Sequence, residues 1–581
     1  MSPKLRVSGI AASLAVLAGL ILLLARPSLD PARVQPIVLV GAAWLAFGCA
    51  ALLLRKVTVR LAVGLILAGG IAVQVVALAG PPQDSSDLYR YIWDGRVQAA
   101  GIDPYLYAPA DAGVAQLRND FLWSGTGPGN YGDCVKNRKD TTDSADSLVA
   151  GCTKLNRPKV PTVYPPVAEA YFLAVQLAAP ADNSTTPIQA AAAMFAMAIT
   201  LILLFGLRKL GKDMRLAALW AWCPTVALEA GQNAHVDVVA VALTAIAVLL
   251  LARARTEGRV VLGGVLIGLA IATKVTPVLV VPAVLRRGWL LICASAATAV
   301  SLVYAPHVLA VGQKIIGFFP GYLKQEGYST GTGFSIIGLV VHGKLATAVA
   351  VVLLGLVALA ILRFGNPDEP WRGGVLMTAA ALAVCTPHFQ WYAILLVMLV
   401  ALDGRPEWLA IAAGGYLANS GHLRIDGIVL HDPRGVGYGA GAAIACLGAL
   451  VRYALTRRAR SRAAGVAVAE PQPGVEAVGV GTAAASEAVT GGLTAADAAD
   501  VAAESVIEPT AVLTLPTVSV TISANGMPAF VIADPGGSVD PGDLAHPGDL
   551  AGSADRDGFA GSDRDERATG PATRAAATTR A

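Results

Sequence analysis

The sequence predicts an all-α membrane protein that crosses the bilayer many times. Apolar residues make up 55% of the 581 residues and charged residues only 14%, well below the roughly 25% of a typical soluble domain. Almost uncharged runs of about 18–20 residues, the length of a bilayer-spanning helix, recur as far as Leu455. A large soluble helical protein does not explain this combination. The basic residues form short clusters between the runs rather than one patch, which argues against nucleic-acid binding.

The apolar runs predict 12–14 transmembrane helices. Two runs, 275–285 and 389–402, are short, and 335–343 is a further segment that could be embedded in the membrane. The first run lacks a small-residue cleavage site, so we interpret it as an uncleaved helix rather than a signal peptide. The candidate spans are residues 7–25, 37–54, 61–79, 187–206, 215–231, 235–252, 260–273, 275–285, 289–307, 345–363, 373–386, 389–402, 407–420 and 436–453.

The charges between the spans predict the orientation in the cell membrane. Lys and Arg clusters face the cytoplasm in most membrane proteins, and here they all fall on one side if both termini are cytoplasmic. The long loop 80–186 is then extracytoplasmic. The clusters are Lys4 and Arg6; Arg55, Lys56 and Arg60; Arg208, Lys209, Lys212 and Arg215; Arg253, Arg255 and Arg259; Arg286 and Arg287; Arg363 and Arg372; and Arg452, Arg457, Arg458 and Arg460.

Composition divides the chain into three parts. Residues 1–60 form N-terminal transmembrane helices, and 61–462 form the membrane core. Residues 463–581 are rich in Ala, Gly, Val, Thr, Asp and Pro and poor in aromatics, which predicts a disordered cytoplasmic tail. The loop 80–186 is too long for a simple connection, so we expect a folded cap with juxtamembrane helices. Its Cys134 and Cys152 are a candidate disulfide in an oxidising compartment.

The start of this loop concentrates acids and aromatics. Asp87 and Asp94 are seven residues apart, which on a helix places them on one face with Tyr91. A carboxylate at the mouth of a partly dry cavity can act as general base toward a hydroxyl, and aromatic rings pack well against sugars. The alternative is structural: acids that cap helices and aromatics that form an interfacial belt.

Ionisable residues also follow other predicted spans on the same side. His235 and Asp237 lie in "GQNAHVD", Lys274 in "ATKVTP" and His388 in "TPHFQWY". Ionisable groups at membrane depth usually line a wet cavity or pair with one another. Lys274, His235 and His388 together suit an anionic phosphate. A snorkelling lysine and structural histidines are the alternative interpretation.

Two stretches of the loop, "DSSDLYRYIWDGRVQAAGIDPYLYAPAD" and "TVYPPVAEAYF", resemble the first extracytoplasmic loop of membrane glycosyltransferases of the GT-C superfamily. The similarity extends over most of 60–400 and is greatest to the polyprenyl-phosphate-mannose-dependent mannosyltransferases of actinobacteria, in or near glycosyltransferase family 87. One departure is that two spans precede the span leading into the acidic loop, where the superfamily typically has none.

The resemblance implies a GT-C-like fold and a role in cell envelope biosynthesis. The reaction would be inverting transfer of mannose from a polyprenyl-phosphate donor to an envelope glycan or glycolipid on the extracytoplasmic side. Asp87 matches the catalytic base, and Asp94 is the second candidate. The residues expected to bind substrate are Tyr91, Trp93, Arg96, Tyr105, Tyr164, His235, Asp237, Lys274 and His388.

No residue spacing demands a metal or another cofactor, although the Asp-rich loop leaves room for a divalent cation. Two other functions remain open at this point. A transporter or flippase for lipid-linked saccharides would need charges near mid-span and related half-sequences, and neither is visible. A non-catalytic envelope assembly protein would use the acidic loop as a binding surface.

Overall fold

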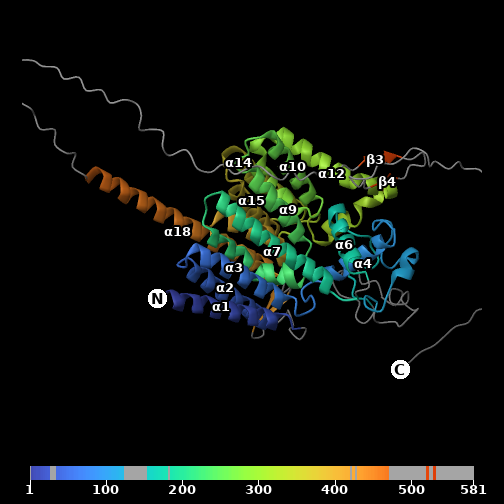
Figure 1. The fold of residues 1–581 in the computed structure, drawn as a ribbon, viewed down its shortest axis with the longest axis horizontal. Helices are drawn as coiled ribbons and strands as arrows, with labels where there is room; N and C mark the ends of the chain where they lie inside the picture. The colour runs from blue at the N-terminus through green and yellow to red at the C-terminus, as the bar shows by residue number, and fades with distance from the viewer. Residues whose placement is uncertain are drawn as a thin grey trace, which may run out of the picture. The chain divides into compact units, whose positions relative to one another are not determined.

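The computed structural model describes residues 2–26, 34–123, 153–180, 183–418, 422–425, 428–469, 519–522 and 528–531 (Figure 1). The chain divides into two units, Met1–Gly474 and Val475–Ala581. Within the second unit, the described residues form the antiparallel strands β3 (Ser519–Ile522) and β4 (Pro528–Val531). The predicted disordered tail lies almost wholly outside the described residues.

Three long helices open the first unit: α1 (Pro3–Leu24), α2 (Val34–Leu54) and α3 (Val59–Ala77). Figure 1 shows them side by side. Gly69 allows α3 to approach the centre closely, because a Cβ at this position would lie 2.6 Å from Nε1 of Trp222. The N-terminal helices are therefore packed onto the rest of the first unit.

A helical cap follows α3. It consists of α4 (Asp87–Ala99), the 3-10 helix η1 (Ala112–Leu117) and α6 (Pro166–Ala178). Helix α4 packs directly against α6 (Figure 1). Gly95 makes this possible, since a Cβ there would lie 2.6 Å from the carbonyl oxygen of Phe172. Helix α6 falls within the segment expected to form a helix outside the spans.

The centre of the first unit contains a broken helix. The chain bends by 117° between the π-helix η3 and the helix α9. Ala234 at the bend has a left-handed φ of +51°. Every residue from Leu219 to Ala242 is buried. The central elements are α7 (Thr186–Lys209), η2 (Met214–Ala217), α8 (Ala218–Ala221), η3 (Val226–Gln232), α9 (Asp237–Leu251) and α10 (Glu257–Ile271).

The remaining elements complete the bundle around this centre. Helix α16 is buried at all ten of its residues, so it contacts protein rather than lipid. These elements are η4 (Thr276–Val280), α11 (Val281–Val284), η5 (Leu285–Arg287), α12 (Trp289–Val311), η6 (Gly312–Ile316), α13 (Phe319–Gln325), η7 (Ile337–Leu339), α14 (Lys344–Phe364), α15 (Pro370–Cys385), η8 (Gln390–Ala393), α16 (Ile394–Asp403), η9 (Pro406–Trp408), α17 (Leu409–Ala418), β1 (His422–Ile425), β2 (Ile428–His431) and α18 (Arg434–Ala469).

The prediction of an all-α polytopic membrane protein is confirmed. Among the described residues, seven helices are long and apolar enough to cross a membrane, or eight if the bent η3–α9 pair is one span. This is fewer than the 12–14 expected, because several predicted runs form short or broken helices. The runs 215–231 and 389–402 are examples, and both lie in the buried centre. Helix α18 continues past the expected boundary at 462/463 to Ala469, and the division into functional parts stays a prediction.

Candidate functional site

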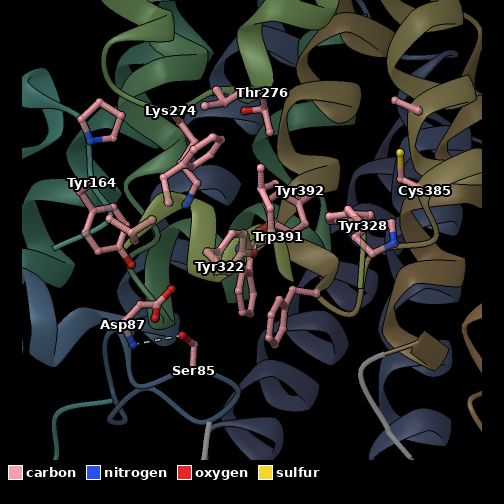
Figure 2. Close-up of a pocket in the computed structure, with 18 of the residues that line it drawn as sticks. Ser85, Asp87, Tyr164, Lys274, Thr276, Tyr322, Tyr328, Cys385, Trp391 and Tyr392 are labelled. Atoms are coloured by element: carbon pink, nitrogen blue, oxygen red, sulfur yellow. Dashed lines mark hydrogen bonds between the residues drawn. The ribbon is translucent and has the colours of Figure 1, made fainter. Parts of the chain in front are cut away.

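A cavity of about 830 Å³ lies between the cap and the helical bundle (Figure 2). Its wall combines the loop before α4, the segment after residue 153, the α10–η4 junction and parts of α13, α14, α15 and η8. The lining residues are Pro82, Gln83, Asp84, Ser85, Ser86, Asp87, Tyr89, Asn156, Arg157, Val163, Tyr164, Pro165, Lys274, Val275, Thr276, Val278, Leu279, Tyr304, Ile315, Ile316, Phe319, Tyr322, Leu323, Tyr328, Phe334, Thr347, Ala350, Val351, Leu354, Ala381, Leu382, Cys385, Pro387, Phe389, Trp391 and Tyr392.

Asp87 is the first residue of α4 and points into this cavity (Figure 2). Its backbone N–H donates to Oγ of Ser85 at 3.1 Å, and its Oδ1 accepts a hydrogen bond of 2.6 Å from Nδ2 of Asn156. A helix N-terminus also favours a negative charge. These contacts hold a carboxylate in a fixed orientation at the cavity wall.

The surroundings of Asp87 favour its ionised form. Burial by itself raises the pKa of Asp87. Electrostatic interactions with His235, Lys274 and Arg157 and the hydrogen bond from Asn156 lower it, and the net effect is a pKa below the usual value. A carboxylate that is ionised at neutral pH can accept a proton from a hydroxyl.

Lys274 enters the same cavity from the junction of α10 and η4 (Figure 2). Its Nζ lies 3.1 Å from Oδ2 of Asp237, which is buried behind the cavity wall. The ammonium also lies 5.4 Å from the ring centre of Tyr164 and 6.0 Å from that of Tyr392. Pro277 is the second residue of the 3-10 helix η4 beyond it. Lys274 is thus a cation held in place by an ion pair, and it faces the same cavity as Asp87.

The rest of the cavity is aromatic and apolar. Figure 2 shows Tyr322, Tyr392 and Trp391 along the cavity, with Cys385 far from Asp87. Aliphatic side chains make up much of the remaining lining. Three of these lie at the outer surface of the bundle: Ile316 is 56% exposed, Val351 is 65% exposed and Val278 is 45% exposed. The apolar wall therefore continues into the exposed apolar surface of the bundle.

Among the residues predicted to form the site, the cavity brings together Asp87, Tyr164 and Lys274. Asp94 lies elsewhere. Seven residues along a helix amount to about 10 Å of rise, and this carries Asp94 away from the cavity into the α4–α6 interface. There it is 1% exposed and 2.9 Å from Nε of Arg90. Burial raises the pKa of Asp94, against the lowering effect of Arg90. The geometry suits a structural ion pair.

Four more predicted residues support the cap without lining the cavity. Tyr91 stacks on Phe172 with ring centres 4.4 Å apart, and Trp93 lies in a buried cap cluster 6.1 Å from Trp123. The remaining two make hydrogen bonds: Arg96 donates to the carbonyl oxygen of Leu117 and to Oδ1 of Asn183, and Tyr105 donates to the carbonyl oxygen of Tyr164.

The predicted histidines also lie outside the cavity lining. His235 is fully buried, with its ring 4.0 Å from that of Trp391, so it stands behind the wall. His388 Nδ1 lies 3.0 Å from Oε2 of Glu326, and Arg434 Nη1 lies 3.4 Å from the same nitrogen. The candidate disulfide residues Cys134 and Cys152 lie outside the described residues.

Sequence reasoning missed a buried acid in the centre. Glu229 of η3 accepts hydrogen bonds from Asn233 at 3.1 Å, Gln390 at 3.0 Å and Tyr416 at 2.9 Å. Gln390 also donates to Oδ2 of Asp84 at the cavity wall, at 3.2 Å. A lone Glu in an apolar run was the only signal in the sequence. Within the described ranges, no three His, Cys, Asp or Glu side chains are grouped in a way that could hold a metal ion.

Sequence reasoning also missed Asn156 and Arg157, which come from a turn of the cap. Arg157 has a left-handed φ of +44° and precedes Pro158. The signal available was weak, a polar pair beside a proline in a long loop.

The fold and the cavity define a polytopic membrane protein with a carboxylate and a cation at the head of an apolar pocket. The sequence model of glycosyltransferase family 87 matches residues 162–387. This match supports a GT-C-like membrane protein of glycosyltransferase family 87, and with it glycosyltransferase activity in general. The matched range includes Tyr164 and Lys274 and excludes Asp87. No curated protein and no solved structure matches the chain.

Proposed function

We propose that this protein transfers a mannosyl group from a polyprenyl-phosphate donor to a glycan or glycolipid acceptor on the extracytoplasmic side. The observation that carries the proposal is the one cavity that joins Asp87 and Lys274 to an apolar wall reaching Val351, which is exposed on a helix long and apolar enough to cross a membrane. Binding of a lipid chain along the apolar wall would be favourable, because burial of each CH₂ group contributes about 0.8 kcal/mol. The phosphate then lies at the polar end.

In the proposed reaction, Asp87 is the general base. Its carboxylate takes the proton of an acceptor hydroxyl while the hydroxyl oxygen attacks the anomeric carbon of the sugar. The bond between the anomeric carbon and the phosphate oxygen breaks, and polyprenyl phosphate leaves with the electron pair. Attack opposite the leaving group inverts the anomeric carbon. Asn156 holds Asp87 in position by donating a hydrogen bond from its Nδ2 to Oδ1 of Asp87.

Lys274 would bind the phosphate. A lysine ammonium acts on phosphate as a compact charge, and its pairing with Asp237 holds it at the cavity wall. The rings of Tyr164 and Tyr392 beside it offer faces for the sugar. Mannose is the sugar that the sequence resemblance suggests.

The test is a donor-selection assay with the purified full chain in lipid nanodiscs. Labelled mannosyl and glucosyl polyprenyl phosphates and a nucleotide-linked mannose would be offered with an envelope glycan extract as acceptor. The proposal expects label transfer from the mannosyl lipid and none from the nucleotide sugar. Transfer from the nucleotide sugar alone would refute the lipid donor, and transfer from the glucosyl lipid alone would refute mannose.

A further inference from the structure

The cap contributes a second cation to the cavity, besides Lys274 of the bundle. Arg157 lines the cavity next to Asn156, the residue that holds Asp87. Its Nε donates to Oε1 of Gln325 at 3.1 Å, and its guanidinium lies 5.7 Å from the ring centre of Tyr322. These contacts join the cap to α13 and hold the guanidinium at the cavity wall.

The two cations border one aromatic wall. The Tyr322 and Tyr392 hydroxyls are hydrogen-bonded to each other. Arg157 lies over the Tyr322 ring and Lys274 over the Tyr392 ring. Figure 2 shows both tyrosines in the part of the cavity that Lys274 and Asp87 face. An anion beside this wall is therefore within the fields of both cations.

The backbone conformation at Arg157 is costly for its sequence. A non-glycine residue rarely adopts a positive φ, and a residue before proline is pushed toward extended conformations. Arg157, at φ +44° before Pro158, goes against both preferences. Strain of this kind persists where the surrounding structure enforces it, and it is concentrated at functional sites.

The charges that line the cavity suggest that Arg157 stabilises negative charge that Lys274 alone does not balance. Among the lining residues, the acids are Asp84 and Asp87 and the cations are Lys274 and Arg157. Asp237 already balances Lys274. A sugar phosphodiester carries one negative charge, and cleavage to a phosphate monoester develops a second. Charge that develops during the reaction is stabilised best by groups already fixed in place.

We propose that Arg157 is a second phosphate-binding residue that stabilises the charge developing on the leaving polyprenyl phosphate. This inference rests on the proposed function. The planar guanidinium can contact two phosphate oxygens at once, from the cap side, while Lys274 contacts the phosphate from the bundle side. A group that acts on developing charge affects kcat and the binding of the released phosphate more than the binding of the donor.

The experiment compares Arg157→Gln and Arg157→Lys with Lys159→Gln, an exposed cation two residues further along the same turn. All variants are measured as full chains in nanodiscs, with thermal unfolding as a folding check. Arg157→Gln should lower kcat by about 10²–10³-fold, the usual effect of removing one fixed transition-state donor. Its inhibition constant for polyprenyl phosphate should rise by about tenfold or more, while KM for the donor changes much less. Arg157→Lys should recover part of the loss.

Several outcomes separate the inference from the proposed function. If wild type transfers mannose and folded Arg157→Gln keeps the kcat and product inhibition of Lys159→Gln, the role of Arg157 is refuted and the proposed function stands. The role is also refuted if donor KM rises in step with the inhibition constant and kcat is unchanged. If wild type neither transfers mannose nor binds polyprenyl phosphate, the proposed function itself fails.

Discussion

The hydrogen bond from Asn156 to Asp87 makes a prediction that separates orientation from protonation. Asn156 Nδ2 lies 2.6 Å from Asp87 Oδ1, a charge-assisted contact of the kind worth about 1.5–3 kcal/mol. Since about 1.4 kcal/mol corresponds to a tenfold change in rate, Asn156→Ala should lower kcat by roughly 10- to 100-fold. This loss should persist at high pH, where Asp87 is ionised in both proteins.

The same substitution should also shift the pH dependence. Asn156 and the nearby positive charges hold the pKa of Asp87 below its usual value, against the effect of burial. Because the base must be deprotonated, activity falls as the pH drops through this pKa. Removing the hydrogen bond raises the pKa, so the acid limb of the profile of kcat against pH should move to higher pH.

The assay is label transfer from mannosyl polyprenyl phosphate at a series of pH values in nanodiscs. Asn119→Ala is the matched control, because Asn119 lies in the cap, bonds Asn183 at 2.7 Å and does not line the cavity. If Asn156→Ala keeps both the wild-type kcat and the wild-type acid limb, the contact with Asp87 does not position the base.

Two further substitutions test other parts of the site. Asp94→Asn leaves the buried Arg90 without its ion-pair partner, and loss of one member of a buried pair costs about 3–5 kcal/mol. The substitution should therefore lower thermal stability, while the folded protein keeps its kcat. A stable but inactive variant would instead point to Asp94 as the base. Val351→Trp places bulk in the apolar wall and should raise KM for a long-chain donor by about tenfold, as expected if roughly two methylene-sized groups lose apolar contact. A donor with two isoprene units should be little affected, and Leu359→Trp, at a 61% exposed position of α14 outside the cavity, is the control. Equal KM values for both tryptophan variants would contradict a lipid chain at Val351.

The apolar runs predicted the all-α membrane fold because bilayer-length helices need little more than length and composition. They predicted the number of spans less well. The run 389–402 is as apolar as a lipid-facing helix, yet α16, which overlaps most of it, is buried at every residue. Composition also did not reveal the 117° bend at Ala234, since helix breaks depend on local backbone conformation.

The candidate site was partly predictable. Asp87 and Lys274 were found because acids and lysines at the ends of apolar runs are unusual. Asp94 was placed beside Asp87 because helical periodicity reports the face of a helix but not the distance along its axis. Asn156 was not predictable, since its contact with Asp87 joins residues 69 positions apart and depends on how the cap folds.

The most direct test of the central claim is the transfer activity of Asp87→Asn compared with Asp213→Asn, the same change at a carboxylate that is 45% exposed. Both would be measured in nanodiscs with labelled mannosyl polyprenyl phosphate, alongside binding of the donor. The account predicts that Asp87→Asn binds the donor but loses transfer by about 10²–10⁴-fold, the usual contribution of a general base, while Asp213→Asn behaves as wild type. Transfer by folded Asp87→Asn at the wild-type rate would contradict it.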